Sequence, residues 1–184
     1  MGIRGMSRIL LLLCPLVIAS AATPEWERAH SLVQKADFQQ AVSVLEKAPD
    51  KDPDNLQLLG EAWIGLKDFK KAVDVLEKAA SIAPRSSSIQ LWLGRAWGRR
   101  AEANKLMAFS WARNAKAAFE RAVALDNKNR EALDDLFEYY VEAPPIVGGG
   151  LDKAEVVAKQ IAAIDSTKGQ RAMERLAKAR GQAN

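Results

Sequence analysis

Aromatic and basic side chains crowd one stretch of the sequence, between residues 92 and 113. The aromatic members are Trp92, Trp97, Phe109 and Trp111, and the basic members are Arg95, Arg99, Arg100, Lys105 and Arg113. Rings interleaved with cations can stack on and pair with an acidic or nucleic ligand. In the structural interpretation, Trp97 instead fills a core position and the arginines form a solvated face. Both interpretations stay open, and this cluster is the best candidate site in the sequence. If it binds a partner, replacing Arg95 and Arg99 by Glu abolishes partner capture without changing helicity.

Catalytic chemistry has little support. A hydrolytic triad needs a positioned base, and the sequence has one histidine, His30, with no thiol and no serine motif near it. A metal site needs three or four ligands, and a lone histidine with scattered acids supplies no such spacing. Glu61 and Asp134 could face each other across a groove, but solvated carboxylates are the simpler interpretation. We therefore expect no catalytic residue, no metal and no cofactor.

Three consecutive glycines, Gly148, Gly149 and Gly150, precede an expected helix start. Backbone amides at such a point can hold a phosphate. However, no Lys-Ser pair follows in the manner of a P-loop, and no strand is expected before it. A loop that needs a positive φ is the simpler explanation.

The elements that would position these residues are repeated. Residues 37–48 recur as residues 68–79 with nine of twelve positions identical, and residues 59–63 return in part as residues 93–97. A period of 31 to 34 residues, carried by small and aromatic residues at helical spacing, is typical of stacked helical hairpins. We predict an all-α solenoid of stacked antiparallel hairpins, with about four repeats and a C-terminal capping helix.

Proline and glycine clusters mark the expected ends of the hairpins. In the third hairpin the period breaks, because the return helix arrives about nine residues late. We expect residues 98–111 to form longer helices plus an extended turn, since insertions in repeat arrays usually map to a loop on one face. The expected helices run over residues 24–35, 38–48, 54–66 and 69–82, with later hairpins around residues 89–122 and 133–161 and a final helix over residues 167–180.

The repeated residues resemble the tetratricopeptide repeat family, and the resemblance covers nearly all of residues 24–166. The second repeat carries the pattern through Leu56, Leu59, Gly60, Ala62, Trp63, Asp68, Phe69, Ala72, Leu76, Ala79 and Pro84. The third carries it through Leu93, Gly94, Ala96, Trp97, Ala115, Phe119 and Ala122. The stretch from Leu136 to Ala154 is also similar to one in exported bacterial members of the family.

The resemblance implies a concave groove, lined by the first helix of each repeat, that takes peptides or protein segments. It places these residues on the groove: Trp26, His30, Gln57, Glu61, Leu91, Arg95, Arg99, Asp134 and Glu138. The groove would carry arginines in the middle and acids at both ends. Members that grip a C-terminal carboxylate use a Lys and an Asn where this chain has Trp26 and His30, so we do not predict such a clamp.

The N-terminus is typical of an export signal. Arg4 and Arg8 precede an apolar run from Ile9 to Ile18, and small residues then offer a cleavage site near Ala21 or Ala22. We predict a signal peptide over residues 1–22, a repeat domain over residues 23–166, and a capping helix with its tail over residues 167–184. The location would be periplasmic or secreted, and a signal that stays uncleaved and anchors the chain in the inner membrane is the alternative.

After cleavage, the chain would contain 25 basic and 23 acidic residues. That balance is too even to indicate a nucleic-acid partner, and no further apolar stretch is long enough to span a membrane. The function we predict is a non-enzymatic scaffold in the cell envelope that binds a protein or peptide on its concave face, with self-association through an exposed aromatic face as a variant. The alternatives are a small-ligand or lipid carrier, with a cavity lined by Trp92, Phe109 and Trp111, and an enzyme with an unrecognised site.

Overall fold

The computed structural model describes residues 24–48 and 52–182, and every regular element within them is a helix. The elements are α1 (Pro24–Gln34), α2 (Phe38–Leu45), α3 (Pro53–Gly65), α4 (Phe69–Ile82), α5 (Ser87–Ala103), α6 (Ala108–Leu125), α7 (Arg130–Glu142), the 3-10 helix η1 (Pro145–Val147), α8 (Leu151–Ile164) and α9 (Ser166–Gln182). The predicted all-α fold is confirmed. The predicted signal peptide lies outside the described residues.

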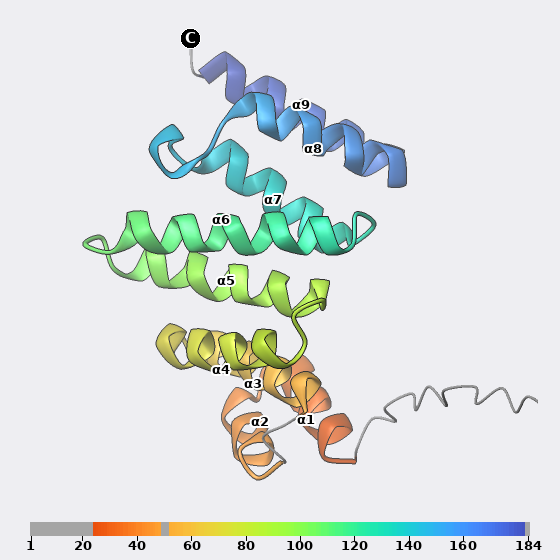
Figure 1. Ribbon diagram of the computed structural model, residues 1–184. Coiled ribbons are helices and arrows are strands. Elements are labelled where there is room, and N and C mark those ends of the chain that lie inside the picture. Colours follow the sequence, from red (N-terminus) through yellow and green to blue (C-terminus); the bar gives the residue numbers. More distant parts are fainter. Residues whose placement is uncertain (1–23, 49–51, 183–184) are drawn as a thin grey trace, which may run out of the picture.

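The helices pair into four antiparallel hairpins that stack along one direction (Figure 1). The hairpins are α1–α2, α3–α4, α5–α6 and α7–α8, and α9 packs on α8 at the end of the stack. The first helices contact one another in order, α1 with α3, α3 with α5, and α5 with α7. Each hairpin buries an apolar face against its neighbour, which explains why one repeat cannot fold alone.

The turns of the first two hairpins have the same geometry because their sequences match. Ala36 and Lys67 occupy equivalent positions and both adopt a left-handed backbone, with φ of 59° and 62°. The aspartate that follows each of them caps the second helix: Asp37 accepts from the Gln40 amide and Asp68 from the Lys71 amide. The cap satisfies a backbone donor that the first helical turn would otherwise leave unpaired.

Close approach between the two helices of a hairpin depends on glycine. A Cβ built on Gly60 in α3 would overlap the Leu76 side chain in α4. One repeat later, a Cβ on Gly94 would lie 2.6 Å from Phe119. The large residue of the second helix therefore fills the space that glycine leaves on the first, as the repeated pattern predicts.

The third hairpin is longer than the second. Helices α5 and α6 have 17 and 18 residues, against 13 and 14 in α3 and α4. Only residues 104–107 separate α5 from α6. The expected longer helices are confirmed, whereas the expected extended turn is wrong, because the additional residues continue the helices on both sides.

The three glycines before α8 have different structural roles. Of the three, only Gly148 lies in the left-handed region, with a φ of 96°. A Cβ on Gly149 would overlap the backbone oxygen of Ala143, whereas a Cβ on Gly150 would meet nothing within 4 Å. The explanation by positive φ therefore holds for Gly148, and close backbone contact explains Gly149.

Within residues 24–48 and 52–182, none of the helices combines the length and the apolar character needed to traverse a lipid bilayer.

Candidate functional site

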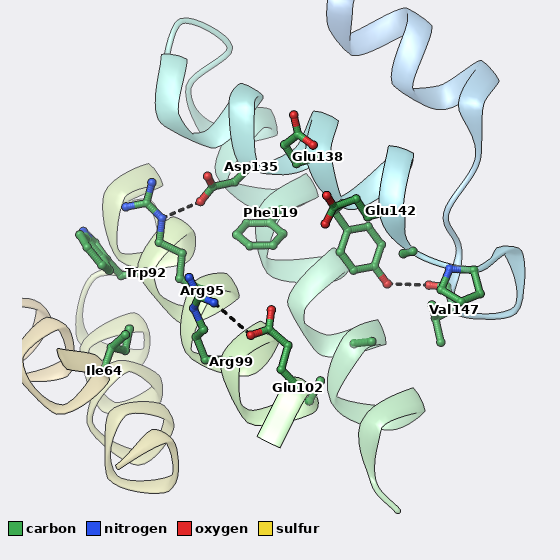
Figure 2. Close-up of a pocket in the computed structure, with 16 residues that line it drawn as sticks. Ile64, Trp92, Arg95, Arg99, Glu102, Phe119, Asp135, Glu138, Glu142 and Val147 are labelled. Atoms are coloured by element: carbon green, nitrogen blue, oxygen red, sulfur yellow. Dashed lines mark hydrogen bonds and ion pairs between the residues drawn. The ribbon is translucent and has the colours of Figure 1, made fainter. Parts of the chain in front are cut away.

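A groove of about 670 Å³ lies between α5 and α7, the first helices of the third and fourth repeats. Figure 2 shows that its charged residues come from these two helices and face one another across the opening. Its charged lining is Arg95, Arg99, Glu102, Asp135, Glu138 and Glu142, and its large apolar and aromatic lining is Ile64, Trp92, Phe119, Tyr139, Pro144 and Val147. We call this feature the groove.

Arg95 joins the two walls of the groove. Its Nε donates to Asp135 Oδ2 across 2.6 Å and its Nη2 donates to Glu131 Oε2 across 2.9 Å. The guanidinium also lies 4.5 Å from the centre of the Trp92 ring. Burial lowers the pKa of Arg95, but the hydrogen bonds and charges of the two acids more than reverse this, so its pKa is raised. The guanidinium is thus a fixed, charged tie between α5 and α7.

Arg99 is paired as well, with Nη1 donating to Glu102 Oε2 across 3.0 Å within the same helix. The groove lining therefore holds two cations against four carboxylates, a formal charge of −2. Both arginines line this groove. Acids do not lie only at the ends, however, because Asp135 and Glu102 stand directly against the arginines.

Glu61 in α3 is next to this network. It accepts a hydrogen bond of 2.9 Å from Gln57 Nε2, one helical turn away. Burial raises the pKa of Glu61 from 4.5 to about 7, although the Gln57 hydrogen bond and the charge of Arg95 oppose the shift. Glu61 is thus not the simple solvated acid that we expected, because it changes charge near neutral pH.

Glu138 occupies the other end of the acidic lining. Burial raises its pKa, and the charge of Arg175 from α9 acts against burial while Glu142 and Asp134 act with it. Arg175 Nη2 lies 3.7 Å from Glu138 and 3.2 Å from Glu142. One cation therefore serves two carboxylates, which leaves this end of the groove negative.

The end wall of the groove is held by a tyrosine. Tyr139 Oη donates to the backbone oxygen of Val147 across 2.9 Å, and this bond fixes the 3-10 turn against α7 (Figure 2). Burial, followed by the charge of Glu120, raises the pKa of Tyr139 to about 12. The hydroxyl therefore stays protonated and keeps donating throughout the physiological range.

The family resemblance places nine residues on the groove, and the structure puts them in different surroundings. Arg95, Arg99 and Glu138 line it, and Gln57 with Glu61 lies beside it. Trp26 and His30 stack on each other in α1, with ring centroids 4.8 Å apart. Asp134 accepts from Lys168 of α9 across 2.8 Å, on the side of α7 that faces the capping helix.

The predicted placement of Leu91 on the groove is wrong. Its side chain is 3% exposed and belongs to the core cluster that contains Phe119 and Leu136. The position is buried because it packs into the core that α5 shares with α6 and α7. Leu91 therefore supports α5 from within and forms no part of the groove wall.

The aromatic and basic cluster is divided by the fold. Trp92 lies in the groove, whereas Trp97 and Trp111 pack together 6.5 Å apart with Arg100 over both rings. Phe109 is exposed at the start of α6. Trp92 and Trp111 line separate clefts, so the structure does not assemble the aromatic cavity of the carrier hypothesis.

Several groove residues were missed in the sequence, above all Asp135 and Tyr139. The family resemblance placed Asp134 and Glu138 of this helix on the groove, and neither Asp135 nor Tyr139. The usable signal was spacing: Asp135 follows Arg95 by 40 residues because the third hairpin is longer than its neighbours. In the part of the chain that the structure describes, no three His, Cys, Asp or Glu side chains gather closely enough to hold a metal ion.

Comparison with known proteins decides the fold family. Residues 53–86, which form the second hairpin and its closing turn, match the family model described as tetratricopeptide repeat. The whole stack is similar to TTC0263, a thermophilic TPR protein in Thermus thermophilus, with a TM-score of 0.70, 17% identity, and 88% of this chain and 84% of that one covered. This chain has the fold of a tetratricopeptide repeat protein.

Two further solved structures match over similar lengths. MamA aligns with a TM-score of 0.64 and 20% identity over 85% of this chain and 81% of its own. YrrB, described as a TPR protein with an unusual peptide-binding site, aligns with a TM-score of 0.58 and 16% identity over 86% of each chain. No curated protein matches this sequence. The tetratricopeptide repeat fold generally serves as a scaffold for contacts between proteins, through the extended concave surface that stacked hairpins create.

Proposed function

We propose that this tetratricopeptide repeat protein is a non-enzymatic scaffold that holds a segment of a protein partner in the groove. The observation that carries the proposal is the construction of the groove, about 670 Å³ of open volume between helices that the Arg95 pairs hold in place. A surface that is formed before binding loses little conformational entropy when a partner arrives. That is the physical advantage of a stacked array.

The lining of the groove indicates the chemistry of its occupant. Trp92, Ile64 and Phe119 offer apolar contact, while the carboxylates outnumber the arginines by four to two. Both arginines already have acidic partners, so they do not favour an acidic ligand. The partner segment should combine apolar side chains with lysine or arginine, since complementary charge steers association and fixes orientation.

A photocrosslinking experiment tests the proposal. A photoreactive amino acid replaces Arg99 or Glu138 in the groove, and in a matched control it replaces Glu77, an exposed residue on the second helix of its hairpin. We expect the same protein to be crosslinked from both groove positions in an extract of the native cells. Capture from all three positions alike, or from none, contradicts a groove ligand.

The structure changes which variants are suitable for testing the groove. Replacing Arg95 by Glu would place three carboxylates together and break the tie to α7, so it would test folding as much as binding. Glu138→Gln with Glu142→Gln is preferable because it removes two charges from the groove lining and keeps the side-chain size. It should weaken capture of a basic segment, and stronger or equal capture contradicts the predicted charge of the partner.

We also propose that the protein works in the cell envelope after its signal peptide is removed. The support is the N-terminal sequence, with Arg4 and Arg8 before an apolar run and small residues up to Ala22. Mass spectrometry of the protein from its native cells tests this. A mature N-terminus at Ala22 or Thr23 is expected, and an intact Met1 in a cytoplasmic fraction contradicts it.

A further inference from the structure

Three large apolar side chains stand exposed together at the α5–α6 turn. Leu106, Met107 and Phe109 are 92%, 48% and 58% exposed and fall within four consecutive positions. Single apolar side chains on a surface are normal, but a contiguous apolar group marks a contact with something else. We call these three residues the tip.

The tip extends beyond the rest of the stack. Helices α5 and α6 are each four residues longer than α3 and α4, which amounts to roughly 6 Å of additional helix. Figure 1 shows the α5–α6 turn projecting past the α3–α4 and α7–α8 connections on the same edge of the molecule. The tip is therefore the first part of that edge to meet a flat surface.

Basic residues lie beside the tip. Lys105 belongs to the same turn, and Arg113 follows Phe109 by four residues and so shares its helix face. Lys67 in the α3–α4 turn and Lys70 in the first turn of α4 line a cleft that reaches Asn104 beside the tip. We call Lys67, Lys70, Lys105 and Arg113 the basic collar. All four are exposed, and none forms an ion pair with any residue that the structure describes.

The nearby acids do not cancel the basic collar. Asp68 lies 3.5 Å from Lys71, and Glu102 is bonded to Arg99. The collar thus keeps a local charge of +4, although the chain as a whole has a net charge of only +4 spread over 184 residues. Overall charge concealed this concentration, because opposite charges are distributed over the other faces.

A second copy of the chain does not fit this surface well. At roughly 200 Å² for a fully exposed large side chain, the tip offers about 400 Å² of contact. A stable protein interface buries about 800 Å² on each partner. A small projecting apolar group with exposed cations beside it matches a soft, negatively charged surface better than a second rigid protein.

We propose that the tip inserts into the boundary between headgroups and acyl chains of an anionic lipid surface, while the basic collar contacts the lipid phosphates. Insertion removes the three apolar side chains from water, and the collar adds a binding factor of roughly fivefold per cation near such a surface. Two weak signals of this kind together give reversible attachment.

A local fluorescent probe tests the proposal on the full 184-residue chain. The sole cysteine is removed by Cys14→Ser, and an environment-sensitive nitrobenzoxadiazole group is attached at Met107→Cys. In the matched control the same group is attached at Val156→Cys, which is 58% exposed on α8, away from the tip. The local readout separates tip insertion from any contact made by the apolar N-terminal run.

With vesicles of phosphatidylglycerol, the probe at residue 107 should brighten and shift to the blue, and the probe at residue 156 should not change. Vesicles of phosphatidylcholine should give little response. The pairs Leu106→Ser with Phe109→Ser, and Lys105→Glu with Arg113→Glu, should each weaken the response roughly tenfold or more. The control pair Ile82→Ser with Val156→Ser removes comparable exposed apolar side chains elsewhere and should have no effect.

Four outcomes overturn the proposal. They are no response at residue 107, equal responses at both probes, equal responses to the two lipids, and a response that grows with protein concentration without vesicles. The last outcome would identify the tip as a self-association surface. Circular dichroism of each variant should show the unchanged helical spectrum, because the substituted residues that the structure describes are all exposed.

Discussion

Arg95 on α5 donates its Nε hydrogen to the carboxylate of Asp135 on α7 across 2.6 Å, which ties together two first helices 40 residues apart. The same guanidinium reaches Glu131 one turn away. An arginine that resembled a free ligand cation in the sequence is therefore part of the groove wall. The groove depends on this pair for its charge and for the spacing of its two sides.

Breaking the pair should reduce stability. Arg95→Ala leaves two carboxylates without their cation, and since Arg95 and Asp135 are 24% and 27% exposed, water compensates only in part. We expect a loss of about 1–2 kcal/mol in the free energy of unfolding, measured by urea denaturation. Arg99→Ala is the control, because Arg99 and Glu102 are 60% and 67% exposed and their pair should contribute less than about 0.5 kcal/mol. Equal effects would show that Arg95 is no clamp.

Helix packing predicts that alanine substitutions at two glycines change the stability of the protein in opposite directions. Gly60→Ala makes the new Cβ overlap the Leu76 side chain and should destabilise the protein by about 1–3 kcal/mol. Gly98→Ala in α5 meets nothing within 4 Å and should stabilise it by about 0.5–1 kcal/mol through helix propensity. Thermal unfolding followed by circular dichroism measures both. A neutral Gly60→Ala would mean that the two helices can separate freely.

The turn before α8 allows a comparison of adjacent glycines. Gly149→Ala makes the new Cβ overlap the Ala143 carbonyl oxygen and requires the backbone to move, so we expect a loss of about 2 kcal/mol or more. Gly150→Ala should change stability by less than about 0.5 kcal/mol, since its site is open. Chemical denaturation of the two variants side by side measures the difference, and similar losses would contradict the described contact.

Glu61 should make stability depend on pH. Its pKa is raised from 4.5 to about 7, so between these values the unfolded chain releases the proton while the folded protein keeps it. This group therefore lowers the free energy of unfolding as the pH rises from 4.5 to 7, by up to roughly 3 kcal/mol. Glu61→Gln should match the original protein at pH 4 and exceed it at pH 8. A difference that is constant with pH would contradict the shifted pKa.

Much of the fold could be predicted because it is local. The duplicated segment fixes two equivalent turns at Ala36 and Lys67 with the same capping aspartates, and the Leu-Gly pairs specify where Leu76 and Phe119 pack. The third hairpin could be predicted only in part. The sequence of residues 98–111 is compatible with either a loop or longer helices. Packing of α5 against α6 favours the longer helices.

The sequence by itself determined the helical repeat, because helix periodicity and turn chemistry act over a few residues. The family resemblance, rather than periodicity, placed Arg95, Arg99 and Glu138 on the groove. Only the tertiary structure decided the burial of Leu91, the pairing of Arg95 with Asp135 and the raised pKa of Glu61. These properties depend on distances and solvent exclusion between helices that are far apart in the chain. The charge of the groove and the projection of the α5–α6 tip follow from the same long-range packing.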